Sequence, residues 1–439
     1  MKPGARIQAA IEILDTIYSA NEPTERLIDF YFRKRRYAGS SDRRAIKDFV
    51  YNILRHISRL NWWIKLVDKE LEINPRIQII AELSLIRNLS LLQIQENFNG
   101  HNHCPLPLTL REEKLAIDLF GQLINHSDMP SFVALEYPKW LDKSLKTIWP
   151  ERLTIEMSAL NQPAPLDIRV NTLKTTLENV RSSLLKDSIN SELMQMSPIG
   201  LRLTEKIRLE ETKAYKMGWI EVQDEGSQLI ALLCDAKPNM DVVDLCAGAG
   251  GKTLALAATM GRNKKMAGQL IACDISSYRL NRLIPRKKRA GALGIQIHTI
   301  DSKTDDWVHY NSMRNDRILV DAPCTGTGTW RRKPISRIQI SPEDLKTKIS
   351  TQKQILQLAS KLIKLGGRII YSTCSILKEE NEDQLNWFVE NHNDFQVIPI
   401  ETVWGETIGG EAPTSLNLRL SPASNRTDGY FCAILEKVR

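Results

Sequence analysis

Along the first 145 residues, apolar side chains recur every three or four positions, with polar residues between them. In the segment 7–18, Ile7, Ile11 and Leu14 fall on one face of a helix. Similar patterns follow at 27–32, 45–54, 62–67, 79–92 and 115–123. Because few stretches alternate with period two, the pattern predicts an all-helical domain over residues 1–145.

The pattern then changes from helical spacing to strand spacing. Around residue 166 apolar and polar positions alternate, and residues 201–203 do the same, which predicts a small α/β subdomain over 146–235. Further on, short apolar runs alternate with helical stretches; the runs are 242–243, 270–272, 295–297, 318–320, 368–371 and 430–435. Strands that alternate with helices are typical of a doubly wound α/β sheet, so residues 236–439 are expected to form an α/β domain.

Composition adds a preference for a polyanionic partner. The 439-residue chain is long enough for two or three domains, and its formal net charge is +8. A basic protein without a nucleic-acid partner stays an open alternative. The helical domain concentrates the charge in Arg33-Lys-Arg-Arg, Arg43, Arg44, Lys47, Arg55 and Arg59, among Tyr31, Tyr37, Trp62 and Trp63. This mixture suits RNA, whereas the alternative is a solvated helix face; for the paired tryptophans, core packing is favoured.

The seven cysteines do not form a metal-binding or disulfide pattern. They are odd in number, widely spread and without a Cys-x-x-Cys pair. The segment His101-Asn-His-Cys104 is expected to be a plain loop, so no metal site is predicted. The amino terminus lacks the pattern of a secretory signal, and no apolar run reaches the roughly 18 residues that span a membrane. We therefore expect a cytoplasmic protein with reduced thiols and no membrane partner.

A glycine-rich turn, Asp244-Leu-Cys-Ala-Gly-Ala-Gly-Gly-Lys-Thr253, follows the strand at 242–243 and opens a helix. Such a turn lets backbone amides approach a ligand closely. It is no phosphate-binding loop, because Cys246 stands where that motif needs glycine, and it does not match the dinucleotide fingerprint. Asp274, Asp301 and Asp321 then each stand close to a strand end. One such aspartate is usually a helix cap, but three behind a glycine turn indicate a cofactor such as S-adenosylmethionine.

Two of the cysteines also follow strands. Cys324 lies in Asp321-Ala-Pro-Cys-Thr-Gly, and Cys374 in Ser372-Thr-Cys-Ser. The carboxyl ends of parallel strands form the ligand-binding edge of an open sheet, so both thiols should face the bound molecule. A cofactor and two thiols indicate covalent transfer chemistry. We expect the other cysteines to be packing residues or, at Cys104, a loop thiol.

These motifs together resemble the RNA cytosine-C5 methyltransferases of the bacterial Sun (Fmu), or RsmB-like, type. The resemblance covers essentially the whole chain and rests on these segments: Asp167-Ile-Arg-Val-Asn-Thr, Gly218-Trp-Ile-Glu-Val-Gln-Asp-Glu-Gly-Ser-Gln, Asp321-Ala-Pro-Cys-Thr-Gly-Thr-Gly, Ser372-Thr-Cys-Ser and Thr427-Asp-Gly-Tyr-Phe. It implies a Rossmann-like class I S-adenosylmethionine-dependent domain and a NusB-like, RNA-binding helical domain. The family's turn usually reads Cys-Ala-Ala-Pro-Gly-Gly-Lys, so this chain departs from it at Gly248 and Ala249.

The resemblance implies roles for individual residues. Cys374 would be the nucleophile that adds to carbon 6 of cytosine, and Cys324 would assist product release. The residues expected to hold S-adenosyl-L-methionine are Cys246, Ala247, Gly248, Ala249, Gly250, Gly251, Lys252, Asp274, Asp301 and Asp321. A target base stacked in a helix is inaccessible, so a loop or a turned-out nucleotide is expected, with Arg331, Arg332 and Lys333 on its phosphates.

The favoured function is thus methylation of cytosine C5 in small-subunit (16S) ribosomal RNA by a monomeric enzyme. Transfer RNA or another RNA is an alternative substrate, because specificity depends on surfaces that these motifs do not define. A DNA cytosine methyltransferase is disfavoured, since that class uses the Pro-Cys thiol as nucleophile and leaves Cys374 unexplained. A further alternative, which is not an enzyme, is an RNA-binding ribosome-assembly factor that retains the methyltransferase fold without its activity.

Overall fold

The computed structural model describes residues 1–439 except 21, 206, 263–264, 301–305 and 406–407. The chain divides into two compact units: residues 1–161 with 332–339, and residues 162–331 with 340–439. None of the helices in the described ranges is long and apolar enough to cross a membrane.

The first unit is helical, as the three-to-four spacing predicts. Its helices are α1 (Pro3–Ser19), α2 (Thr24–Lys34), α3 (Ser40–Val67), α4 (Pro75–Leu85), α5 (Leu91–Asn97), α6 (Leu110–Leu119), α7 (Ser131–Ala134), the 3-10 turn η1 (Lys139–Leu141), α8 (Asp142–Ile148), α9 (Leu153–Leu160) and, from the later segment, α17 (Ser336–Gln339). Trp63 is buried in their shared core and its indole donates to the Ile124 carbonyl (3.0 Å). The expected core packing of the tryptophans is therefore confirmed, with Trp62 edge-on against Trp63.

Two helix boundaries differ from the apolar pattern, each for a local reason. The predicted segment 79–92 is interrupted, because Asn88 has a positive φ of 53° and Ser90 caps the start of α5 in a capping box. The segments 45–54 and 62–67 instead join in the single helix α3, which has one non-helical residue at His56. The apolar pattern in the sequence runs across the break near Asn88, and it is interrupted within α3 although the helix continues. The helix ends are therefore set by caps and backbone dihedrals and not by the apolar pattern.

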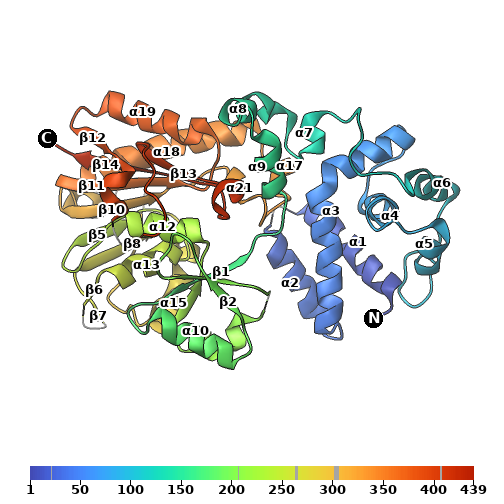
Figure 1. Ribbon diagram of the computed structural model, residues 1–439, viewed down its shortest axis with the longest axis horizontal. Helices are drawn as coiled ribbons and strands as arrows, with labels where there is room; N and C mark the ends of the chain where they lie inside the picture. Colours follow the sequence, from blue (N-terminus) through green and yellow to red (C-terminus); the bar gives the residue numbers. More distant parts are fainter. Residues whose placement is uncertain (21, 206, 263–264, 301–305, 406–407) are drawn as a thin grey trace. The chain divides into compact units, whose positions relative to one another are not determined.

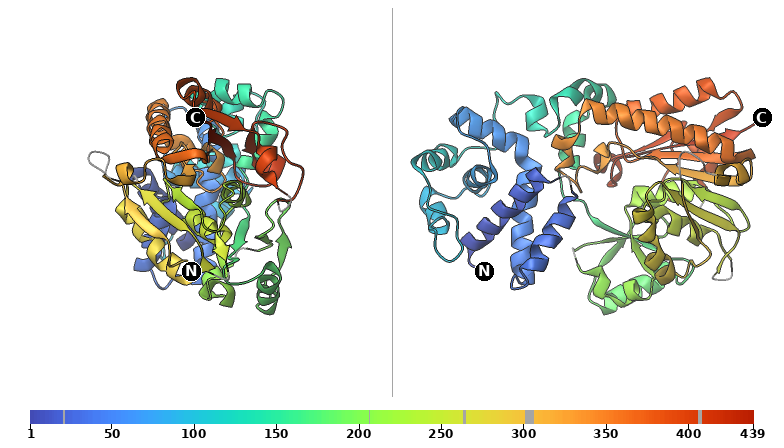
Figure 2. Two further views of the ribbon diagram at one scale, coloured as in Figure 1. Left: turned by 90° about the vertical axis from the view of Figure 1, so that its left-hand side faces the viewer. Right: turned by 180° about the vertical axis from the view of Figure 1, so that it is seen from behind.

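The second unit contains the predicted small α/β region. Its antiparallel sheet has the order β2-β3-β1-β4. The elements are β1 (Leu166–Val170), α10 (Leu177–Lys186), β2 (Ser191–Leu193), β3 (Gly200–Leu203), η2 (Leu209–Glu211), α11 (Lys213–Lys216) and β4 (Ile220–Val222). Val180 and Leu184 of α10 bury their side chains with Ile168 and Val170 of β1, so the helix covers one face of this sheet (Figure 2).

The larger sheet of this unit has the order β12-β14-β11-β10-β5-β8-β9, with β13 paired to β14. Its strands are β5 (Asp241–Asp244), β8 (Gln269–Asp274), β9 (Gln296–Thr299), β10 (Asn315–Asp321), β11 (Ile363–Thr373), β12 (Phe395–Ile398), β13 (Asn417–Leu420) and β14 (Tyr430–Lys437); β6 (Gly261–Arg262) and β7 (Lys265–Met266) pair separately. The five strands from β9 to β11 are parallel, whereas β14 runs antiparallel to β11. All six apolar runs predicted as strands are found here.

Period-two alternation in these buried strands divides the core into two layers. Val242 and Leu319 face α12 and α13, whereas Val243 and Ile318 face α18 and α19 (Figure 1). The helices are α12 (Glu225–Leu233), α13 (Gly251–Thr259), α14 (Ser277–Asn281), α15 (Leu283–Ala290), α16 (Asp306–Tyr310), η3 (Thr327–Thr329), α18 (Pro342–Leu362), η4 (Lys378–Glu380), α19 (Glu382–Asn391), α20 (Ile400–Trp404) and α21 (Pro422–Asn425). Helices on both faces leave the carboxyl ends of β5, β8, β10 and β11 at one edge.

Candidate active site

The glycine-rich turn connects β5 to α13. Gly250 caps the helix in the left-handed conformation (φ 81°), and a Cβ there would lie 2.2 Å from Leu283, so only glycine fits. Gly248 and Gly251 instead face open space, since a Cβ on either would meet nothing within 4 Å. The turn therefore has room for a ligand beside the amino terminus of α13, where backbone amides point outward.

Asp274 is brought to this turn by the register of β5 and β8. Its carboxylate accepts from the backbone N–H of Gly248 (2.9 Å) and of Ser276 (2.8 Å), and it forms an ion pair with Arg279 (2.6 Å). The residue is only 3% exposed, and two backbone amides hold its carboxylate against the turn. This is the position expected of an acid that grips a cofactor ribose. Asp301, the next predicted acid, lies outside the described residues.

Asp321 ends β10 and meets the lysine of the glycine turn. Lys252 Nζ lies 2.7 Å from Asp321 Oδ2, and Ser372 Oγ donates to Asp321 Oδ1 (3.3 Å). Burial by itself lowers the pKa of Lys252, but the charges of Asp321 and Cys374 outweigh it and raise that pKa above its usual value. Lys252 is therefore a buried ammonium group that forms an ion pair with the Asp321 carboxylate.

The two predicted thiols lie side by side. In the parallel pairing of β10 with β11, Asp321 is opposite Ser372, so the short segments that follow bring Cys324 and Cys374 together. Their sulfur atoms are 3.3 Å apart, and both side chains are partly exposed. The hydrogen bond to Cys374, and then burial, raise the pKa of the Cys324 thiol well above its usual value. Cys324 therefore retains its proton at neutral pH, and either sulfur can be the donor in this contact.

A buried glutamate that the sequence analysis missed holds the Cys324 loop. Glu380, in η4, accepts from the backbone N–H of Thr325 (2.9 Å) and from Gln352 Nε2 (3.0 Å). The same amide of Gln352 donates to the carbonyl of Pro323 (3.1 Å). Burial raises the pKa of Glu380. Its position a few residues after Cys374 could have marked Glu380 as a candidate site residue. Its hydrogen-bond partners could not be predicted, because Thr325 and Gln352 come from distant segments.

Glycines allow the two thiol loops and the segment before β14 to approach one another. The N–H of Gly328 donates to the carbonyl of Cys374 (2.9 Å), and the N–H of Gly429 donates to that of Gly328 (2.8 Å). A Cβ on Gly328 would lie 2.1 Å from the Gly429 oxygen. The motifs around Cys324, Cys374 and Asp428 therefore form one backbone-linked assembly.

Arg331, predicted to contact RNA, is instead engaged inside the fold. Its guanidinium is buried and forms ion pairs with Asp428 and with Asp224 (3.1 Å). Lys333, two residues on, is exposed. The basic run at 286–289 is similarly engaged, because Arg286 and Arg289 both pair with Glu221. Position in the sequence could not reveal these carboxylate partners, since they come from distant segments.

The sheet order, the glycine turn after the central strand β5 and the acid at the end of β8 define a Rossmann-like methyltransferase domain that binds S-adenosylmethionine. Comparison with known proteins agrees. Residues 231–436 match the family described as 16S rRNA methyltransferase RsmB/F, and residues 137–210 match the ferredoxin-like domain of RsmF/B-like methyltransferases.

Individual proteins extend the likeness to most of the chain. The probable ribosomal RNA small subunit methyltransferase B of Synechocystis is 29% identical, over 98% of this chain and 99% of its own. The ribosomal RNA small subunit methyltransferase B of Sodalis glossinidius is 32% identical over 69% of this chain and 66% of its own. A crystal structure of a methyltransferase homolog from Pyrococcus horikoshii superposes with a TM-score of 0.59 at 29% identity, covering 70% of this chain and 97% of that one.

The chain belongs to the RsmB/F family of RNA cytosine-C5 methyltransferases. Its cofactor is accordingly S-adenosyl-L-methionine. The described residues fit that molecule, because the turn has open space at Gly248 and Gly251 and a fixed carboxylate at Asp274.

Proposed function

We propose that this protein methylates carbon 5 of a cytosine in 16S ribosomal RNA through a covalent adduct with Cys374. The observation that carries the proposal is the pair of thiols 3.3 Å apart beside the Lys252–Asp321 ion pair. The names of the curated relatives support ribosomal RNA as the substrate. That substrate also implies a cytoplasmic enzyme, which we take to act as a monomer.

The first step needs a nucleophile, because carbon 5 of cytosine is too weak to attack a methyl sulfonium unaided. The Cys374 thiolate adds to carbon 6 and so raises the electron density at carbon 5. Asp321, held by Lys252, is our candidate for contact with the cytosine ring. S-adenosylmethionine, when bound, supplies an electrophilic methyl group to carbon 5.

The second step releases the product. The proton on carbon 5 passes to a base such as a water molecule, its bonding electrons form the 5,6 double bond, and the bond between carbon 6 and Cys374 sulfur breaks as the sulfur leaves with that bond's electron pair. We assign assistance in this step to Cys324, which is adjacent and retains its proton at neutral pH. Cofactor binding is assigned to residues 246–252, Asp274, Asp321 and, outside the described residues, Asp301. For the RNA phosphates we propose the exposed Lys333 with Arg332, and not the buried Arg331.

Methyl transfer to matched transcripts tests this function. Purified protein is incubated with labelled S-adenosylmethionine and either a 16S ribosomal RNA transcript or a pool of transfer RNA transcripts, and 5-methylcytosine is mapped in the product. We expect one or a few modified cytosines in 16S RNA and none in Cys374→Ala incubations. If only transfer RNA were modified, transfer RNA would be the substrate in place of 16S RNA. If the protein bound RNA but methylated neither substrate, a noncatalytic assembly factor would be favoured.

A further inference from the structure

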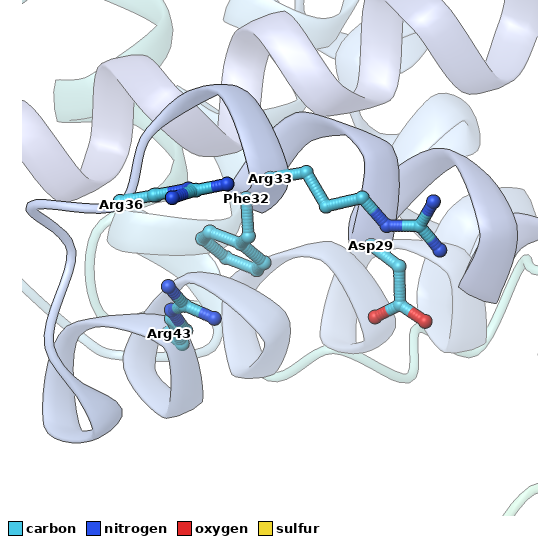
Figure 3. A pocket seen from close by; sticks show the side chains of 5 residues that line it. All are labelled: Asp29, Phe32, Arg33, Arg36 and Arg43. Atoms are coloured by element: carbon cyan, nitrogen blue, oxygen red, sulfur yellow. The ribbon is translucent and has the colours of Figure 1, made fainter.

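The helical unit contains a cationic cavity of about 340 Å³. Its lining residues come from the end of α2, the following loop and the first turn of α3; they are Asp29, Phe32, Arg33, Arg36 and Arg43. Arg36 and Arg43 lie on either side of the Phe32 ring, and Arg33 extends along α2 toward the side of Asp29 (Figure 3). The volume is within the range of pockets that hold small ligands.

Local folding fixes this arrangement. The N–H of Ala38 donates to the carbonyl of Arg35 (3.1 Å), which turns the chain so that α3 begins at Ser40. Arg43 then returns beneath α2, where its Nε donates to the Ala38 carbonyl (2.8 Å) and its guanidinium lies 5.3 Å from the centre of the Phe32 ring. Because Phe32 is buried in the helical core, one wall of the cavity and one of its cations are positioned before any ligand binds.

Nearby arginines outside the cavity form ion pairs with carboxylates, whereas among the described residues the arginines of the cavity do not. Arg26 pairs with Glu22 (2.8 Å), and Arg35 pairs with Glu12 (2.8 Å). In the ranges that the structure describes, by contrast, none of the three cavity arginines forms an ion pair. The one acidic residue of the lining, Asp29, lies 3.9 Å from Lys47 and is thereby partly neutralised. Three guanidinium groups therefore remain available to an anion.

Exposed aromatic rings accompany these cations. Tyr37, directly after Arg36, is 72% exposed, and Phe30 is 53% exposed with the ammonium of Lys34 above its ring at 4.4 Å. Guanidinium groups bind phosphate oxygens in bidentate geometry, and solvent-exposed rings stack on unpaired bases. An acidic protein surface would use the cations but would not need the rings, so this combination favours RNA.

We propose that the cavity of Arg33, Arg36 and Arg43 is the place in the helical unit that binds a phosphodiester of the RNA backbone. The assignment rests on the proposed function, because that function makes RNA the ligand. It selects three arginines from the many basic residues of residues 1–145. Arg35 and Arg59 are excluded, since Glu12 and Glu136 already neutralise them.

The test compares two exposed arginines of the cavity, Arg33 and Arg36, with the exposed Arg26 of α2, the helix that also carries Arg33. The double variant Arg33→Gln/Arg36→Gln removes two cavity charges, whereas Arg26→Gln removes an exposed charge whose surface ion pair adds little to stability. Binding of the full-length protein to a 16S ribosomal RNA transcript is measured over a series of KCl concentrations. We expect the double variant to bind several-fold more weakly, with a salt slope smaller by about 1.4, or about 0.7 for each phosphate that is no longer neutralised.

The control and the thermal midpoints make the outcome interpretable. Arg26→Gln should retain the wild-type slope, and both variants should unfold at the wild-type temperature because the changed side chains are exposed. An unchanged Kd and slope in the double variant would overturn the cavity assignment, even if the wild type methylates the transcript. Arginine-dependent binding without methyl transfer by the wild type would instead refute the proposed function and leave the RNA contact standing.

Discussion

Cys324 and Cys374 have different surroundings although their sulfur atoms are only 3.3 Å apart. Cys374 is within the electrostatic reach of the Lys252 ammonium, whereas Cys324 has the buried Glu380 carboxylate among its neighbouring charges. Negative charge opposes ionisation of a thiol, so Glu380 contributes to the raised pKa of Cys324. A protonated Cys324 is consistent with the proposal that Cys374 is the nucleophile, an assignment that residue types and their spacing could not decide.

Gly250 is the residue of the turn that least tolerates a side chain. Gly250→Ala would need a φ of 81° and would bring Cβ within 2.2 Å of Leu283. We expect it to lower the free energy of unfolding by about 1–3 kcal/mol, measured by urea denaturation. Gly251→Ala is the matched control, because its Cβ meets nothing within 4 Å and its φ is not positive. Equal stability of the two variants would contradict this account of the turn.

Asp244 makes stability depend on pH. Burial raises its pKa to about 7 from 3.8, and the Oδ1 atom has no hydrogen-bond partner among the described residues. The folded state therefore holds a proton that the unfolded state has released, so this contribution is present below about pH 4 and is lost as the pH rises toward 7. Without added cofactor, wild type should lose stability relative to Asp244→Asn between about pH 4 and pH 7, with little further change above pH 7. A difference that does not change with pH would refute this prediction.

At the scale of elements, the ends of neighbouring strands bring distant motifs together. The motif around Asp224 precedes α12, and the motif around Asp428 precedes β14, yet Arg331 bonds to both carboxylates. The three segments thereby secure the loop that follows Cys324. Motif matching found all three segments, but the ion pairs between them depend on tertiary packing that spacing along the chain does not encode.

Arg331→Met tests whether this residue is structural. It would leave two buried carboxylates without their cation, which typically costs about 3–5 kcal/mol. Lys333→Met, on an exposed side chain, should change stability by no more than about 0.5 kcal/mol while it weakens RNA binding. The measurements are urea unfolding and RNA affinity on both proteins. A stable Arg331→Met protein with reduced RNA affinity would restore Arg331 to the RNA-binding set.

At the scale of the molecule, the strands of the parallel sheet could be predicted because each is a short buried run such as 318–320. The helical character of the first unit followed equally from its spacing. The membership of residues 332–339 could not be predicted, since these residues follow the Cys324 loop but bury Ile335 in the helical core. Arg337 in the same segment bonds to Leu160 and Asn161. The edge strands β12 and β13 were also missed, because they are short and partly exposed.

The division into two units predicts where cofactor binding resides. Every described residue of the turn and of the thiol pair belongs to the second unit, so residues 162–439 should bind S-adenosylmethionine as the whole chain does. Isothermal titration calorimetry measures the affinity, and circular dichroism verifies the fold. The truncated chain is also made with Ile335→Ser, because without the helical unit the Ile335 side chain would be exposed to solvent. A folded truncated protein without affinity for the cofactor would contradict the prediction.

The central claim is that Cys374 forms the adduct and Cys324 helps to release it. Wild type, Cys374→Ala and Cys324→Ala are incubated with S-adenosylmethionine and the 16S transcript, and protein linked to RNA is scored on a denaturing gel. We predict that Cys374→Ala gives neither methyl transfer nor adduct, whereas Cys324→Ala accumulates the covalent complex. An adduct in Cys374→Ala that is absent from Cys324→Ala would contradict the assignment and exchange the two roles.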